Sequence, residues 1–213
     1  MPTKKSRQSN YFAFCENCES ICCKGARPPL IQKRINSIKK FLLKENIEIK
    51  QPFKRTMYFF PREVDGEYCV FFNRDKKKCV IHPIKPETCA AGPITFDINP
   101  DIGNIEYYLK SKNICRLAGA LYLNKKELKN HLLFAKSKIV SLVKDLPKED
   151  LSVILSIEEP DTFKIGEDKL DPEIVKRVCR VKKKIKVSTP MQTKRSRKSP
   201  LGLSKPLSDI LPH

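Results

Sequence analysis

Cysteine is the residue type whose placement stands out in this chain, which contains nine cysteines among 213 residues. Four of them fall within nine positions, in the order Cys15-x2-Cys18-x3-Cys22-Cys23. A CxxC loop lets two thiolates reach one ion while backbone N–H groups point at the sulfurs. Four thiols this close together therefore favour a metal role over incidental or buried thiols.

Wider spacing separates the next four cysteines: Cys69, Cys79, Cys89 and Cys115. Cys69 comes soon after the turn signal Asp65-Gly66, and Cys89 comes soon after Pro86. A compact fold could bring these cysteines to the first cluster. Each one taken alone is equally typical of a small core residue.

The motifs taken in order resemble those of a known family. After the first cluster come Cys69-Val-Phe-Phe, then Cys79-Val-Ile-His82-Pro83, then Lys85-Pro86-x2-Cys89. This order resembles the zinc/iron-chelating cysteine-cluster family (YkgJ-like, CxxCxxCC proteins), over residues 11–120. The resemblance implies a metal or iron–sulfur protein, of a kind often called an oxidoreductase. It implies these candidate metal ligands: Cys15, Cys18, Cys22, Cys23, Cys69, Cys79, Cys89 and Cys115.

Several positions depart from that family's pattern. Three residues precede the Cys22-Cys23 pair where two are common, Lys85 stands for the usual Arg, and Ala90 for a frequent Arg. Cys115 is similar to a later family cysteine in a Cys-Pro-Gly setting, but the Pro and Gly are replaced here. The resemblance therefore implies the ligand set and leaves the geometry open.

Zinc and iron–sulfur clusters are the two cofactors that this donor set suits. Four thiolates make a closed tetrahedral zinc site, and they hold an iron–sulfur cluster equally well. Seven or eight cysteines make two such sites, or one site with spare thiols. We expect the adjacent Cys22 and Cys23 to point in different directions and to serve separate roles. His82 is an alternative ligand, because Cys79-x2-His82 has workable spacing.

Charged residues beside the cysteines have two interpretations. Lys24, Arg27, Arg74 and residues 76–78 either lower the pKa of the thiols or are ordinary solvated turn residues. No GxxxxGK[ST], GxGxxG or HExxH motif occurs, and only three histidines are present. The catalytic residues are therefore unknown, and the sequence leaves open whether the protein is an enzyme. Cys179 falls outside the family pattern and is predicted to be a free thiol.

The expected compartment determines whether the thiols are reduced, and the net charge indicates what kinds of partner the chain could bind. No apolar run approaches the roughly 20 residues of a membrane span, and no apolar segment follows the polar first ten residues. We expect a cytoplasmic protein with reduced thiols. The net charge is +19, of which residues 176–213 contribute +11, with twelve Lys or Arg and one Asp. Such charge is typical either of nucleic-acid or ribosome association or simply of solubility.

The helix and hairpin patterns along the chain predict an α+β fold. We expect a small metal-stapled and loop-rich domain with β-hairpins and flanking helices. Apolar periodicity predicts amphipathic helices over residues 27–45 and 125–146, and a shorter one over 151–157. Turn residues predict two hairpins, in which residues 55–61 pair with 67–73 and residues 95–98 pair with 105–109. A further short strand is predicted over residues 78–82; residues 160–180 are ambiguous, with one helix over 172–180.

Four regions follow: a disordered lead (1–10), the cysteine-cluster domain (11–120), a helical extension (121–180) and a disordered basic tail (181–213). Three functions compete. The first is a module whose metal chiefly holds the fold together. The second is an iron–sulfur oxidoreductase or electron carrier. The third is a zinc-stabilised factor that binds RNA or the ribosome through its basic tail; no small-molecule substrate is indicated.

Overall fold

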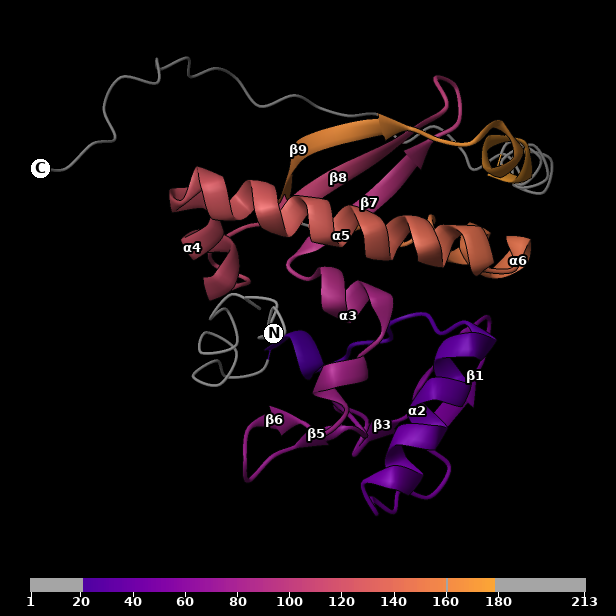
Figure 1. The fold of residues 1–213 in the computed structure, drawn as a ribbon, viewed down its shortest axis with the longest axis vertical. Helices are drawn as coiled ribbons and strands as arrows, with labels where there is room; N and C mark the ends of the chain where they lie inside the picture. Colours follow the sequence, from indigo (N-terminus) through magenta and orange to yellow (C-terminus); the bar gives the residue numbers. More distant parts are fainter. Residues whose placement is uncertain (1–20, 160, 179–213) are drawn as a thin grey trace, which may run out of the picture.

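The computed structural model describes residues 21–159 and 161–178, which form helices and small antiparallel sheets around two hydrophobic cores (Figure 1). The predicted α+β class is confirmed. In these two ranges no helix is both long and apolar enough to cross a membrane. We call residues 21–84 the hairpin half and residues 94–178 the sheet half; α3 (Glu87–Ala91) lies between them.

Some predictions lie outside the described residues. These are the disordered lead, the ligands Cys15 and Cys18, the free thiol Cys179 and the basic tail.

Helix α2 (Gln32–Lys44) is the main element of the hairpin half and confirms the predicted amphipathic helix, although it begins five residues later than predicted. Its apolar residues recur three or four positions apart, so that one stripe of the helix is buried. Two residues from the loops after short strands complete this small core. The core contains Leu30, Ile35, Ile38, Leu42, Phe71 and Ile81.

Three short antiparallel hairpins make up the rest of this half. They pair β1 (Phe53–Arg55) with β2 (Phe59–Pro61), β3 (Glu63–Val64) with β4 (Tyr68–Cys69), and β5 (Phe72–Asn73) with β6 (Lys78–Cys79). The Asp65-Gly66 turn is confirmed, and both of its residues have positive φ, 54° and 67°, as a tight hairpin turn requires.

The predicted pairing of residues 55–61 with residues 67–73 around that turn is wrong. Arg55 pairs with Phe59 inside one hairpin, so residues 55–61 bend back on themselves instead of forming one strand. The predicted strand 67–73 is likewise divided in two, because Phe71 turns into the core and is fully buried. The predicted strand 78–82 ends at Cys79. The chain then enters η2 (His82–Ile84), where Pro83 lacks the N–H that a strand would use.

The sheet half is built on a three-stranded antiparallel sheet in the order β7 (Ile94–Asn99), β8 (Asn104–Lys110), β9 (Thr162–Lys169). The predicted hairpin between β7 and β8 is confirmed. Strand β9 corrects the ambiguous stretch after residue 160. Four of the eight residues of β9 are charged, as is common at a sheet edge. This composition made the strand hard to recognise from the sequence, although β9 pairs with β8.

Helix α5 (Lys125–Asp145) lies across this sheet and confirms the second predicted helix (Figure 1). Asn124 caps it by accepting a hydrogen bond from the Glu127 N–H at 3.2 Å. On the predicted apolar face, Ala135, Ile139 and Leu142 are buried. Shorter helices are α4 (Arg116–Leu123), α6 (Lys148–Ile154), which begins three residues earlier than predicted, and residues 172–178.

The sheet-half core takes residues from both sides of position 120, because β8 pairs with β9 and α5 covers the sheet. The domain boundaries proposed above stay predictions. A polar contact also joins the two halves: Arg55 on β1 donates to the buried Asp150 carboxylate on α6 at 3.2 Å.

Candidate metal centre

Five of the predicted ligands lie on four elements whose ends meet in one region. Cys22 and Cys23 lie on η1 (Ile21–Cys23), and the others lie on β4, β6 and α3. An antiparallel bridge between Lys24 and Tyr68 places the segment after η1 beside β4. This pairing brings two cysteines that are 46 positions apart in sequence, Cys23 and Cys69, to neighbouring backbone positions.

The two hairpin cysteines share one local structure. In Cys69-Val70-Phe71 the N–H of the third residue interacts with the thiol and favours its ionised form. The same holds for Cys79 and the N–H of Ile81. Phe71 and Ile81 are both buried in the hairpin-half core, so apolar packing fixes the backbone that supports each sulfur. N–H groups directed at thiolates are a common way to stabilise metal-bound cysteine.

Cys89 is held in place through its helix. Arg34 on α2 donates from Nε to the Glu87 carboxylate at 2.8 Å, and from Nη1 to the Ile84 carbonyl at 3.3 Å. On the other side, His131 on α5 donates through Nε2 to the Ala91 and Gly92 carbonyls at 3.1 and 3.0 Å. Both ends of the short helix α3 are therefore anchored.

The thiols lie within electrostatic range of one another, because negative charge on one raises the pKa of another. Burial raises the pKa of Cys89, and negative charge on Cys69, Cys79 and Cys22 raises it further. Burial also raises the pKa of Cys69 to about 11, with Cys79 adding to the effect. The Cys23 pKa is raised by its hydrogen bond to Cys22, by burial and by negative charge on neighbouring cysteines. A bound cation would relieve this mutual repulsion between thiolates.

Cys22 differs from its neighbours. Its pKa is lowered to about 6, first because the Cys23 thiol donates a hydrogen bond to it, and then because of the charges of Lys85 and Lys110. Above that pH, Cys22 is a thiolate in a site whose other members keep their protons. The prediction that Cys22 and Cys23 point in different directions is wrong, because their thiols share a hydrogen bond. That the two cysteines serve separate roles stays a prediction.

The cations that act on Cys22 are not the ones singled out from the sequence. Lys24 pairs with Glu67 at 3.6 Å, Arg27 with Glu63 at 2.8 Å, and Arg74 with Asp65 at 3.1 Å. Lys85 was noted only as a motif residue, and Lys110 carried no local signal at all. Lys110 ends β8 in the sheet half, so only the folded chain brings it to Cys22.

Cys115 and His82 are the remaining predicted ligands that the structure describes. Cys115 precedes α4, where its N–H donates to the Ser111 carbonyl at 3.0 Å and its side chain packs against the sheet-half core. Its role as a ligand stays a prediction. His82 Nε2 lies 3.4 Å from Lys85 Nζ, and its role as an alternative ligand also stays a prediction.

The described residues do not form a complete coordination site. Within residues 21–159 and 161–178, no three His, Cys, Asp or Glu side chains are grouped closely enough to hold one ion. Electrostatic interaction extends over several ångströms, whereas four thiolates on zinc stand about 3.8 Å apart, given Zn–S bonds of about 2.3 Å. The donor set is nonetheless of the right type, since thiolates prefer zinc and iron to hard cations.

Comparison with known proteins identifies the region. The family model CxxCxxCC, described as "Putative zinc- or iron-chelating domain", matches residues 14–116. No curated protein and no solved structure matches the chain. The matched range contains all eight predicted ligands and excludes Cys179. Residues 14–116 therefore resemble the CxxCxxCC family, whose model describes a zinc- or iron-chelating domain.

Proposed function

We propose that the chain binds zinc or iron through the thiolates of its cysteine cluster, and that the ion chiefly holds the hairpin half together. One observation carries this proposal: thiols from η1, β4, β6 and α3 interact with one another in a single region. Neutral thiols can gather as small apolar groups, but a bound cation would favour their ionised forms and offset the repulsion between them.

The hairpin half needs such a link. Its strands are only two or three residues long, and isolated two-stranded hairpins are marginal in water. Each of the hairpins β3–β4 and β5–β6 ends in a cysteine. An ion shared by these cysteines and by η1 and α3 would connect segments that otherwise share one small core, which couples metal binding to folding.

Several residues of the chain would each have a different role in binding the metal. Cys22, ionised near neutral pH, offers the first negatively charged donor. The Phe71 and Ile81 N–H groups stabilise Cys69 and Cys79 as they lose their protons. Lys85 and Lys110 offset part of the negative charge. When bound, zinc supplies a closed tetrahedral link, whereas an iron–sulfur cluster supplies one-electron redox chemistry as well.

Metal analysis with absorption spectroscopy on the full chain, purified without oxygen, tests this proposal. We expect stoichiometric zinc in a colourless protein, or stoichiometric iron in a brown one whose absorption bleaches on reduction. The latter result would favour the electron-carrier alternative. Cys69→Ser should lose the metal and Cys179→Ser should retain it. A protein that holds neither metal, as purified or after reconstitution, would refute the proposal.

A further inference from the structure

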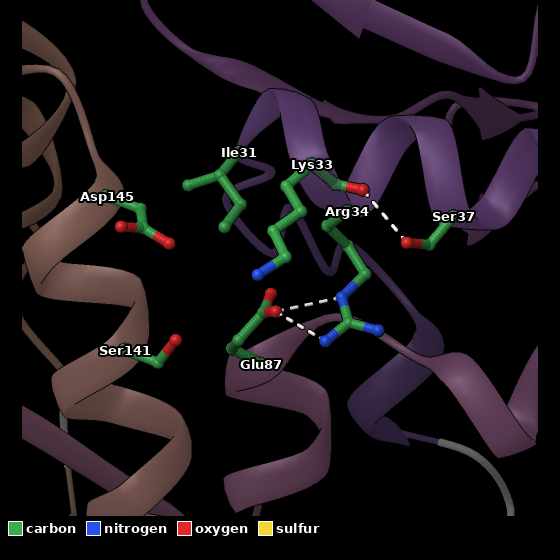
Figure 2. A pocket seen from close by; sticks show the side chains of 7 residues that line it. All are labelled: Ile31, Lys33, Arg34, Ser37, Glu87, Ser141 and Asp145. Atoms are coloured by element: carbon green, nitrogen blue, oxygen red, sulfur yellow. Dashed lines mark hydrogen bonds and ion pairs between the residues drawn. The ribbon is translucent and has the colours of Figure 1, made fainter.

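A pocket of about 110 Å³ lies between α2, α3 and α5 (Figure 2). Lys33 and Arg34 come from α2, Glu87 from α3, and Ser141 and Asp145 from α5. Charged and hydroxyl groups thus face one another across the boundary between the two halves. The volume exceeds that of one water molecule several times over, so the pocket has room for a small molecule.

Glu87 is the residue that points to a ligand. It is only 4% exposed, and one carboxylate oxygen, Oε1, accepts from Arg34. The other oxygen, Oε2, is buried and has no hydrogen-bond partner in the part of the chain that the structure describes. Figure 2 shows the Glu87 carboxylate directed toward the Lys33 side of the pocket. A buried acceptor left without a donor is rare and favours a ligand that brings one.

The pocket's charges are balanced. Lys33 and Arg34 are cationic, and Glu87 and Asp145 are carboxylates. Arg34 is already paired with Glu87, whereas Lys33 and Asp145 make no ion pair among the described residues. A ligand with a single charge would therefore satisfy one side and leave the other unpaired. A molecule with both an ammonium and a carboxylate group satisfies both sides.

We propose that this pocket binds a small zwitterion of the α-amino-acid class. The ligand ammonium would donate to Glu87 Oε2 and to Asp145, and its carboxylate would accept from the Lys33 ammonium. Ser141 adds a hydroxyl on the α5 wall. Glycine and alanine are the smallest members of this class and serve as probes. This binding function goes beyond the metal centre and does not depend on it.

Isothermal titration of the full chain with L-alanine tests the proposal, with acetate and methylammonium as probes that carry only one charge each. We expect saturable heat with a Kd on the order of 1 mM or below, since so small a ligand has few atoms to contribute. Acetate and methylammonium should bind at least tenfold more weakly. Equal binding of acetate would indicate a simple anion site, and no saturable heat with either alanine or glycine would indicate no site; both results overturn the proposal.

Matched variants locate the binding. Lys33→Met and Asp145→Asn should each weaken alanine binding at least tenfold, and both residues are exposed enough that the fold should tolerate the change. Lys40→Met is the control, because Lys40 is exposed on the same helix but lies outside the pocket. Unchanged affinity in both pocket variants would contradict the proposal. Metal content is measured in each preparation, so that a failure of the metal proposal is recognised separately.

Discussion

The two halves of the molecule are stabilised by different means. The sheet half has strands of six to eight residues, a helix of 21 residues and most of a core of 17 buried residues. The hairpin half has strands of two or three residues and a core of six. Burial of apolar surface therefore accounts for the stability of the sheet half. The hairpin half contains four of the six cysteines that the structure describes, and we propose that bonds to a metal supplement a core too small to suffice.

The largest effect should follow the loss of one ligand. Cys69→Ser or Cys89→Ser should release the metal and destabilise the hairpin half by on the order of 5 kcal/mol, since structural zinc contributes about 10 kcal/mol. Metal analysis and urea unfolding measure both consequences. Cys179→Ser serves as the control. Full metal content together with unchanged stability in the ligand variants would show that neither cysteine is a ligand.

The next largest effect concerns the ion pair that anchors α3 to the hairpin half. Arg34→Met would leave the buried Glu87 carboxylate without its cation, at a cost of about 4 kcal/mol. Arg74→Met is the matched control, because Arg74 and Asp65 are both exposed and their ion pair should matter little. Urea unfolding compares the two variants. Equal stability of both variants would exclude a structural role for the buried pair.

A core substitution in the sheet half should separate stability from metal binding. Ile139 is fully buried, so Ile139→Ala should lower the free energy of unfolding by about 3 kcal/mol through the cavity that it creates. The metal content of the folded variant should stay the same. If Ile139→Ala lost its metal at temperatures well below its unfolding, metal binding would depend on the sheet-half core. That result would contradict the different stabilisation of the two halves.

The smallest effect concerns pH and His131, which links α5 to α3. Burial lowers the pKa of His131, so its protonation opposes folding. Stability from this group is complete above the unfolded pKa of about 6.5 and declines as pH falls toward the folded pKa. Between pH 7.5 and pH 5.5, the free energy of unfolding should therefore fall less in His131→Gln than in the wild type. Urea unfolding at both pH values measures this, and parallel declines would rule out His131 as the cause.

Local patterns made part of this structure predictable from the sequence. The helices α2 and α5 follow from apolar spacing, and the β7–β8 hairpin follows from its turn residues. The cysteine spacing likewise predicted a metal-binding family. The rest depends on contacts between distant segments. Lys110 acts on Cys22 only because the folded chain brings them together, and β9 is recognisable as a strand only beside β8.

The pattern shared by the cysteines at the ends of β4 and β6 was only partly predictable from the sequence. Cys69-Val70-Phe71 and Cys79-Val80-Ile81 share one pattern, a cysteine followed two positions later by a large apolar residue. The sequence alone shows this similarity. Its meaning became clear only with burial of Phe71 and Ile81 and the direction of their N–H groups toward the sulfurs.

Hydrogen exchange measured by mass spectrometry, with and without a chelator, tests whether a metal stabilises the hairpin half. Removing the metal should abolish amide protection across the hairpins β1 to β6. Protection across β7, β8 and α5 should persist, because the sheet-half core is independent of the metal. Protection that is unchanged throughout, or lost equally in both halves, would contradict a metal that stabilises the hairpin half.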